Sequence, residues 1–212
     1  MARISRQGSS SRSKSSHSKP SRTSPQAREE QNPFRRADEE RDRKGGGREQ
    51  RGFFLHRPVA VIAIEALAQV MLEGRYAGKV IEQAFKNEKK MGARDRRQFA
   101  EIVYDLVRWW RKSGAAFGWN ETTTPQKSDL WKWLAVLIIE RNLKEIGEPR
   151  LPNWPEFERI SADKVAHRLS EIEPTKDRAI FESIPDWMDE LGEKELGRRW
   201  PQILHSLNLQ AP

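Results

Sequence analysis

The chain of 212 residues contains no cysteine. It therefore cannot form a disulfide scaffold, a thiolate zinc site or an iron–sulfur cluster, and it has no cysteine nucleophile for covalent catalysis. Disulfides are rare in the reducing cytosol, so their absence fits the cytoplasm, where we expect the protein. The four histidines show no metal-ligand spacing, and no Ser/His/Asp arrangement stands out. We predict no catalytic residue, no metal and no cofactor site in this chain.

Long apolar runs are also lacking. The longest stretches, at residues 59–72 and 134–139, are broken by polar residues or are far shorter than the roughly 20 residues of a membrane span, so we expect no membrane partner. The N-terminus has no apolar segment typical of a secretory signal. Strand signals are missing too, because the sequence shows neither a convincing period-two pattern nor a hairpin dipeptide.

Charge is abundant but unevenly distributed. The chain has 39 Lys and Arg against 31 Asp and Glu, for a net charge of +8, and residues 1–52 hold 14 of the basic and only seven of the acidic side chains. This segment is rich in Ser, Arg and Gly and poor in apolar residues, which predicts a disordered basic tail. The tail is either an electrostatic hook for nucleic acid or a solubilising segment, and charge alone does not separate the two.

From Phe53 onward the apolar residues recur at helical spacing, which predicts an all-α fold. The strongest stripe, Phe99 to Trp110, marks a third helix, and the apolar helix at Ser128–Arg141 is expected at the centre of the core. The first predicted helix has its apolar residues at 59–71 and stops at Gly74, and the third follows Gly92. The other predicted helices span residues 76–91, 128–141, 162–172, 178–183, 185–191 and 193–207, with Pro201 kinking or restarting the last.

Basic residues gather in the second and third predicted helices. Residues 75–112 hold 11 basic and five acidic side chains, whereas residues 171–195 hold nine acidic and three basic ones. Lysine and arginine at one end of a domain are typical of RNA phosphate binding, and a solvated charged face is the alternative. The candidate RNA contacts are Lys86, Lys89, Lys90, Arg94, Arg96, Arg97, Arg111 and Lys112.

Two adjacent tryptophans end the third predicted helix. Trp110 continues the apolar stripe and is assigned to the core. Trp109 is the better candidate for an exposed stacking surface, with core packing as the commoner alternative. Arg108 follows Tyr104 by four residues on the same helix. We favour a structural role for Arg108, stacking on an aromatic ring or closing a helix end by hydrogen bonds, over RNA contact.

Three segments carry a family resemblance: ARDRRQFAEIVYDLVRWWR (Ala93–Arg111), LPNWPEFERISADKV (Leu151–Val165) and SIPDWMDELGEKELGRRWPQILHSLNLQAP (Ser183–Pro212). Their order and spacing resemble the N-terminal NusB-like domain of the RsmB/Sun (Fmu) family of ribosomal RNA cytosine-5 methyltransferases. The motif positions are Tyr104, Arg108, Trp110, Pro185 and Trp187. The resemblance implies a NusB-like helical bundle at residues 53–182 that binds ribosomal RNA. It also implies linker helices at residues 183–212 that lead toward a methyltransferase domain, and S-adenosylmethionine as the cofactor of the full-length family.

The departure from the family is as informative as the match. The family adds a cysteine thiolate to carbon 6 of cytosine before methyl transfer, and this chain has no cysteine and no strand–Gly-rich-turn–helix unit for the cofactor. We therefore expect an RNA-targeting domain that is inactive alone, with a separate or downstream methyltransferase domain as partner. The alternatives are a NusB-like antitermination or ribosome-assembly factor that docks on a protein, and the start of a complete enzyme. An in-frame Pro-Cys motif beyond the codon for Pro212 would indicate the last of these.

Overall fold

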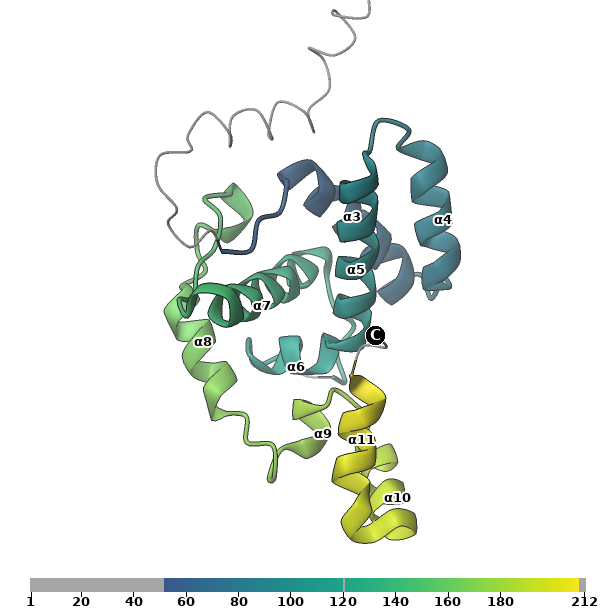
Figure 1. The fold of residues 1–212 in the computed structure, drawn as a ribbon, viewed down its shortest axis with the longest axis vertical. Helices are drawn as coiled ribbons and strands as arrows, with labels where there is room; N and C mark the ends of the chain where they lie inside the picture. Colours follow the sequence, from purple (N-terminus) through teal and green to yellow (C-terminus); the bar gives the residue numbers. More distant parts are fainter. Residues whose placement is uncertain (1–51, 120, 210–212) are drawn as a thin grey trace, which may run out of the picture. The chain divides into compact units, whose positions relative to one another are not determined.

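The computed structural model of the chain describes residues 52–119 and 121–209, which lie in one compact unit. This part of the chain is helical and contains no strand, as the spacing of apolar residues predicts (Figure 1). The elements are α3 (Arg57–Met71), α4 (Ala77–Asn87), α5 (Ala93–Arg108), α6 (Trp110–Ala115), α7 (Lys127–Ile146), η1 (Pro155–Phe157), α8 (Ala162–Glu171), α9 (Arg178–Phe181), α10 (Asp186–Leu196), η2 (Gly197–Arg199) and α11 (Trp200–Asn208). The predicted tail, residues 1–52, lies outside the described residues except for Gly52.

The main hydrophobic core lies between α3, α4, α5 and α7. On α5 the apolar stripe begins with Phe99, Ile102 and Val103, all of which are fully buried. The opposite face of α5 is polar, so the helix forms because burial of one stripe stabilises it against α3 and α7. Helix α4 lies beside α5 and has only Val80 and Ile81 fully inside the core (Figure 1).

The central helix is α7, in agreement with the prediction, although it is longer than residues 128–141. At its start, Gln126 and Asp129 form a capping box that satisfies free backbone N–H groups. It continues to Ile146 because the first residue that favours a stop is Gly147, which adopts the left-handed conformation with φ of 73°. Trp133 is fully buried at the middle of the helix.

The predicted third helix is in fact two helices. Helix α5 ends at Arg108, Trp109 leaves the helical conformation with φ of −101° and ψ of 21°, and α6 begins at Trp110. Trp110 still packs against the main core, as expected, because its ring meets those of Trp119 and Trp133 at centroid distances of 5.6 and 6.5 Å. The sequence pattern missed the break because the apolar spacing continues across it.

The C-terminal helices surround a small core of their own, formed by Ile184, Trp200 and Leu204. The prediction placed a helix break before Glu193, and this is wrong: α10 runs through Gly192 to Leu196. Gly192 is there because a Cβ at this position would overlap the ring of Trp200. The chain turns instead at Gly197, and Pro201 lies in the first turn of α11, where it restarts the helix as predicted.

The other predicted boundaries are close to the observed ones. Helix α4 begins at Ala77 and ends at Asn87, so it is shorter than the predicted helix at residues 76–91. Residues 88–92 therefore form a turn between α4 and α5. Helix α8 ends one residue and α9 two residues before the predicted ends.

Candidate nucleic-acid interface

The turn between α4 and α5 carries the most accessible group of predicted RNA contacts. Lys89 and Lys90 lie in the turn itself, and Arg94 lies in the first turn of α5. All three side chains are exposed, and none forms an ion pair within residues 52–119 and 121–209. They are therefore three accessible positive charges beside the N-terminus of a 16-residue helix, where backbone N–H groups also favour anions.

Lys86, Arg96 and Arg97 surround this group but are held by neighbours. Lys86 pairs with Glu82 at 2.6 Å, and the hydrogen bond from Lys86 lowers the pKa of that carboxyl. Arg96 donates to the Met91 carbonyl at 3.0 Å and lies 5.4 Å from the centre of the Phe85 ring. Arg97 donates to Glu101 at 3.1 Å, yet its side chain is 84% exposed. The turn and the start of α5 thus bring together six of the eight predicted RNA contacts.

Arg111 does not belong to this surface, and its assignment as an RNA contact is corrected by its position. The residue is only 5% exposed and lies at the start of α6. Its guanidinium donates to Glu121, to the Ile184 carbonyl and to Asp186, the last at 2.6 Å. Burial lowers the pKa of Arg111, but the hydrogen bonds and charges of the two carboxylates outweigh burial and raise it.

The backbone of Arg111 contacts the same C-terminal segment as its side chain, because the Arg111 N–H donates to the Ser183 hydroxyl at 3.0 Å. Ser183 is the single non-glycine residue with positive φ in the described chain, at 56°. Arg111 thus connects the segment that enters α10 to the start of α6. The sequence offered no signal for this role, because burial of an arginine depends on partners more than 70 residues away.

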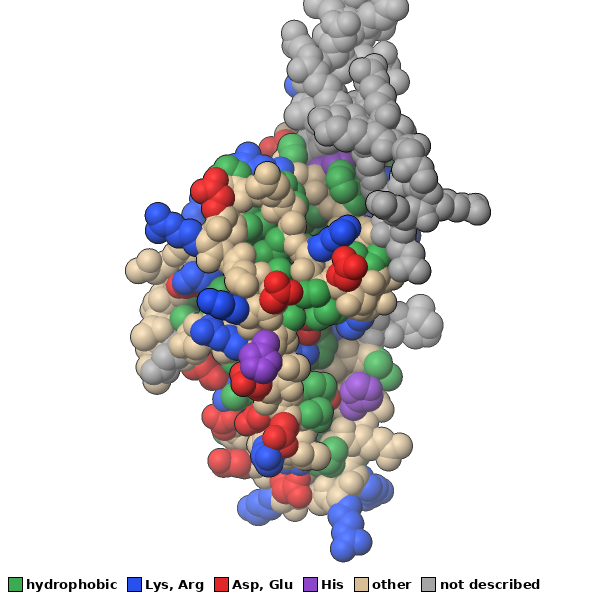
Figure 2. Space-filling model, turned by 90° about the vertical axis from the view of Figure 1, so that its left-hand side faces the viewer, with side chains coloured by type: hydrophobic (Ala, Val, Ile, Leu, Met, Phe, Trp, Pro, Cys, Tyr) green, Lys and Arg blue, Asp and Glu red, His purple; other side chains and the backbone are tan. Residues whose placement is uncertain are grey.

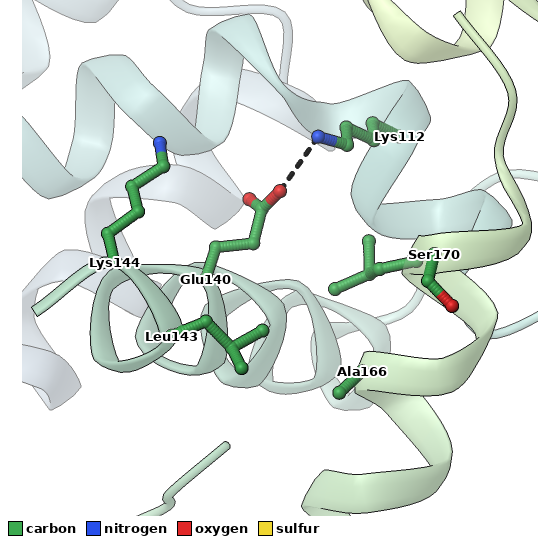
Figure 3. A pocket seen from close by; sticks show the side chains of 7 residues that line it. Lys112, Glu140, Leu143, Lys144, Ala166 and Ser170 are labelled. Atoms are coloured by element: carbon green, nitrogen blue, oxygen red, sulfur yellow. Dashed lines mark hydrogen bonds and ion pairs between the residues drawn. The ribbon is translucent and has the colours of Figure 1, made fainter. Parts of the chain in front are cut away.

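Lys112 is also engaged within the fold. Its Nζ lies 2.8 Å from Glu140 and 4.8 Å from the centre of the Phe181 ring. Figure 3 shows the pair at the edge of a cavity of about 320 Å³, together with Leu143 and Lys144 of α7 and residues of α8. A lysine held by a carboxylate and an aromatic ring has little freedom to reach a phosphate.

A larger groove, of about 670 Å³, lies between α5 and α7 on one side and α9 and α11 on the other. The sequence gives no sign of this groove, because its lining comes from five separate helices: α5, α6, α7, α9 and α11. Five carboxylates line the groove, against three Lys or Arg side chains and His205. The acidic lining residues are Glu101, Asp105, Glu140, Glu145 and Glu182. This charge balance disfavours the groove as a binding site for RNA phosphates.

The remaining motif residues have clear positions. Arg108 donates from Nη1 to the Asn208 carbonyl at the end of α11, at 3.2 Å, so it makes the helix-end hydrogen bond that the structural interpretation expects. Tyr104, on the same face of α5, is exposed. Pro185 precedes α10 in extended conformation, and Trp187 is 61% exposed on that helix. Trp109, expected as an exposed stacking surface, is half-buried and lines the large groove.

Figure 2 shows the face of the molecule that carries α7 and α8, on the left of Figure 1. Basic and acidic side chains are interspersed over its upper part, and acidic side chains gather lower down. Within residues 52–119 and 121–209, no three His, Asp or Glu side chains lie together in a way that could hold a metal ion. No helix in the same part of the chain has both the length and the apolar content needed to cross a membrane.

Taken together, the described residues define an all-α protein with a cluster of accessible cations at one helix–helix turn. Comparisons with protein-family models, with curated proteins and with solved structures found no match for this chain. The function is therefore inferred from the chemistry of the exposed surface.

Proposed function

We propose that the chain is an RNA-binding module whose phosphate contacts are made around the turn between α4 and α5. The observation that carries this proposal is that Lys89, Lys90 and Arg94 are exposed and have no carboxylate partner within the described residues. Lysines and arginines that serve only solubility are commonly interspersed with acidic side chains, whereas phosphate binding needs cations free to replace condensed counterions.

The resemblance to the NusB-like domain of ribosomal RNA cytosine-5 methyltransferases gives the proposal its finer form. Ribosomal RNA is then the ligand, the cytoplasm is the location, and methyl transfer belongs to a separate or downstream domain. S-adenosylmethionine would bind that domain, because the described residues form no strand and thus no strand–turn–helix cradle for a nucleotide. No catalytic step is assigned to this chain.

The test uses two matched pairs of adjacent basic residues. Lys89→Gln/Lys90→Gln removes two charges beside α5, and Arg198→Gln/Arg199→Gln removes two exposed charges from η2, next to the acidic α10. The proposal predicts that the first variant weakens binding of ribosomal RNA fragments, measured by fluorescence anisotropy, and that the second leaves it nearly unchanged. Equal losses in both variants would indicate attraction by net charge alone and would contradict the proposed surface.

A second function has an observation of its own. Trp187 and Leu191 are both exposed, and a spacing of four residues places them on one face of α10. Leu207 and Leu209, at the end of α11, are exposed as well. Exposed apolar side chains on the last helices favour a protein-docking surface, as in an antitermination or assembly factor. A Trp187→Ser/Leu191→Ser variant should then lose co-purification with its protein partner and keep its affinity for RNA.

A further inference from the structure

The chain contains two tyrosines, and both lie on the surface next to the same glycine. Tyr76 is 77% exposed and Tyr104 is 51% exposed. A Cβ placed on Gly78 would lie 3.5 Å from a ring carbon of Tyr76 and 3.7 Å from the hydroxyl oxygen of Tyr104. The two side chains, one from the residue before α4 and the other from α5, therefore border one spot of the surface.

Folding alone does not account for these residues. Tyr76 precedes α4 at the capping position, but its side chain caps no backbone N–H group, whereas Ser, Thr, Asp or Asn at this position would do so. Tyr104 lies on the solvent face of α5, where a long polar residue has the higher helix propensity. Gly78, in the first turn of α4, places no side chain between the two tyrosines, at a cost in helix propensity.

Positive charge lies on both sides of Tyr104. Arg97 and Arg108 are seven residues before and four residues after it, a spacing that places all three on one face of α5. At a rise of about 1.5 Å per residue, the two arginines lie roughly 10 Å and 6 Å along the helix from Tyr104. Both arginines are exposed, although Arg97 also pairs with Glu101 and Arg108 also donates a hydrogen bond to the Asn208 carbonyl. The accessible cations of the turn lie at the N-terminal end of the same helix. Exposed aromatic rings with cations beside them are the combination that binds unpaired bases and the phosphates between them.

We infer that Tyr76 and Tyr104 form a stacking platform for unpaired bases, so that the ligand of this surface is single-stranded RNA. This inference rests on the proposed RNA-binding function and names its substrate class. In a duplex the base faces are stacked on one another and are closed to a side chain, whereas in a loop or a single strand they are open. The platform therefore contributes to binding of the single strand and not of the duplex.

The experiment compares a fluorescein-labelled single-stranded RNA of 16 nucleotides with the duplex of the same sequence, using the full chain. Alanine substitutions that remove base stacking commonly weaken single-strand binding by about five- to 100-fold per base. We expect Tyr76→Ala/Tyr104→Ala to weaken single-strand binding by at least about tenfold and to leave duplex binding unchanged. Tyr76→Phe/Tyr104→Phe keeps both rings and should bind as the wild type does. Tyr76→Leu/Tyr104→Leu keeps apolar bulk without an aromatic ring and should also lose single-strand affinity. This variant provides the test if the alanine variant does not fold.

The outcomes separate the two proposals. If the wild-type chain binds RNA but the leucine variant retains full single-strand affinity, the platform is overturned and the proposed function stands. Equal losses for single strand and duplex also overturn the platform. If the wild-type chain binds neither form of RNA, both proposals fail. Circular dichroism of each variant checks that the helices are intact.

Discussion

Replacing Arg111 with methionine should loosen the C-terminal helices from the rest of the protein. Methionine keeps the unbranched apolar part of the side chain and removes the guanidinium, which donates to the Ile184 carbonyl, Glu121 and Asp186. The two carboxylates are 39% and 70% exposed, so they return to water at small cost once the arginine is gone.

The magnitude follows from the three partners. A charge-assisted hydrogen bond to a buried carbonyl contributes about 1.5–3 kcal/mol, and each solvated ion pair contributes about 0–1 kcal/mol. We therefore expect Arg111→Met to lower the free energy of unfolding by about 2–4 kcal/mol. The loss should be local as well: hydrogen exchange should speed up in α10 and α11 and stay slow in α3, α5 and α7.

The assay is urea unfolding followed by tryptophan fluorescence, with hydrogen-exchange mass spectrometry to locate the change. Arg97→Met is the matched control, because its single ion pair is exposed and should contribute less than about 0.5 kcal/mol. A result in which Arg111→Met is as stable as this control and hydrogen exchange in α10 and α11 is unchanged would refute the reasoning. Arg111 would then not hold these helices to the rest of the protein.

Two further variants and one titration test the C-terminal core. Gly192→Ala should destabilise the protein by about 1–3 kcal/mol in urea unfolding, because its Cβ would overlap Trp200, and a wild-type midpoint would contradict that packing. Burial raises the pKa of Asp189, but hydrogen bonds from Arg178 and Trp200 outweigh burial and lower it. The lowered pKa adds stability above the unfolded-state value near 4, and this contribution is lost as the pH falls through the folded-state value. The difference in unfolding free energy between wild type and Asp189→Asn should therefore shrink in acid, and a difference independent of pH would rule out this role.

The helices could be predicted from the sequence because their stability depends on repeating apolar positions. The stripe from Phe99 to Leu106 located α5, and the nearly all-apolar run around Trp133 located the central helix. Breaks between helices were harder, because they depend on contacts distant in sequence. In the sequence, Gly192 suggests the end of a helix. In the structure the helix continues through it, and glycine is needed there because the ring of Trp200 lies too close for a Cβ.

The candidate surface was predictable for the same kind of reason, and only in part. Lys89, Lys90 and Arg94 lie within six residues of one another in the sequence, so a local charge count found them. The same local charge count also included Arg111. Only the fold reveals that Arg111 is buried against residues of another segment. Tyr76, just before α4, and Tyr104, on α5, both lie beside Gly78, and no spacing rule within one helix indicates that they meet there.

The most direct test of the central claim is the salt dependence of RNA binding by the intact chain and by a Lys89→Gln/Lys90→Gln/Arg94→Gln variant. Each phosphate contact contributes about 0.7 to the slope of log affinity against log salt concentration on single strands and about 0.9 on duplex. The account predicts a steep negative slope for the wild type and a slope smaller by about two in the variant. Equal slopes for the two proteins, or binding that does not change with salt, would contradict it.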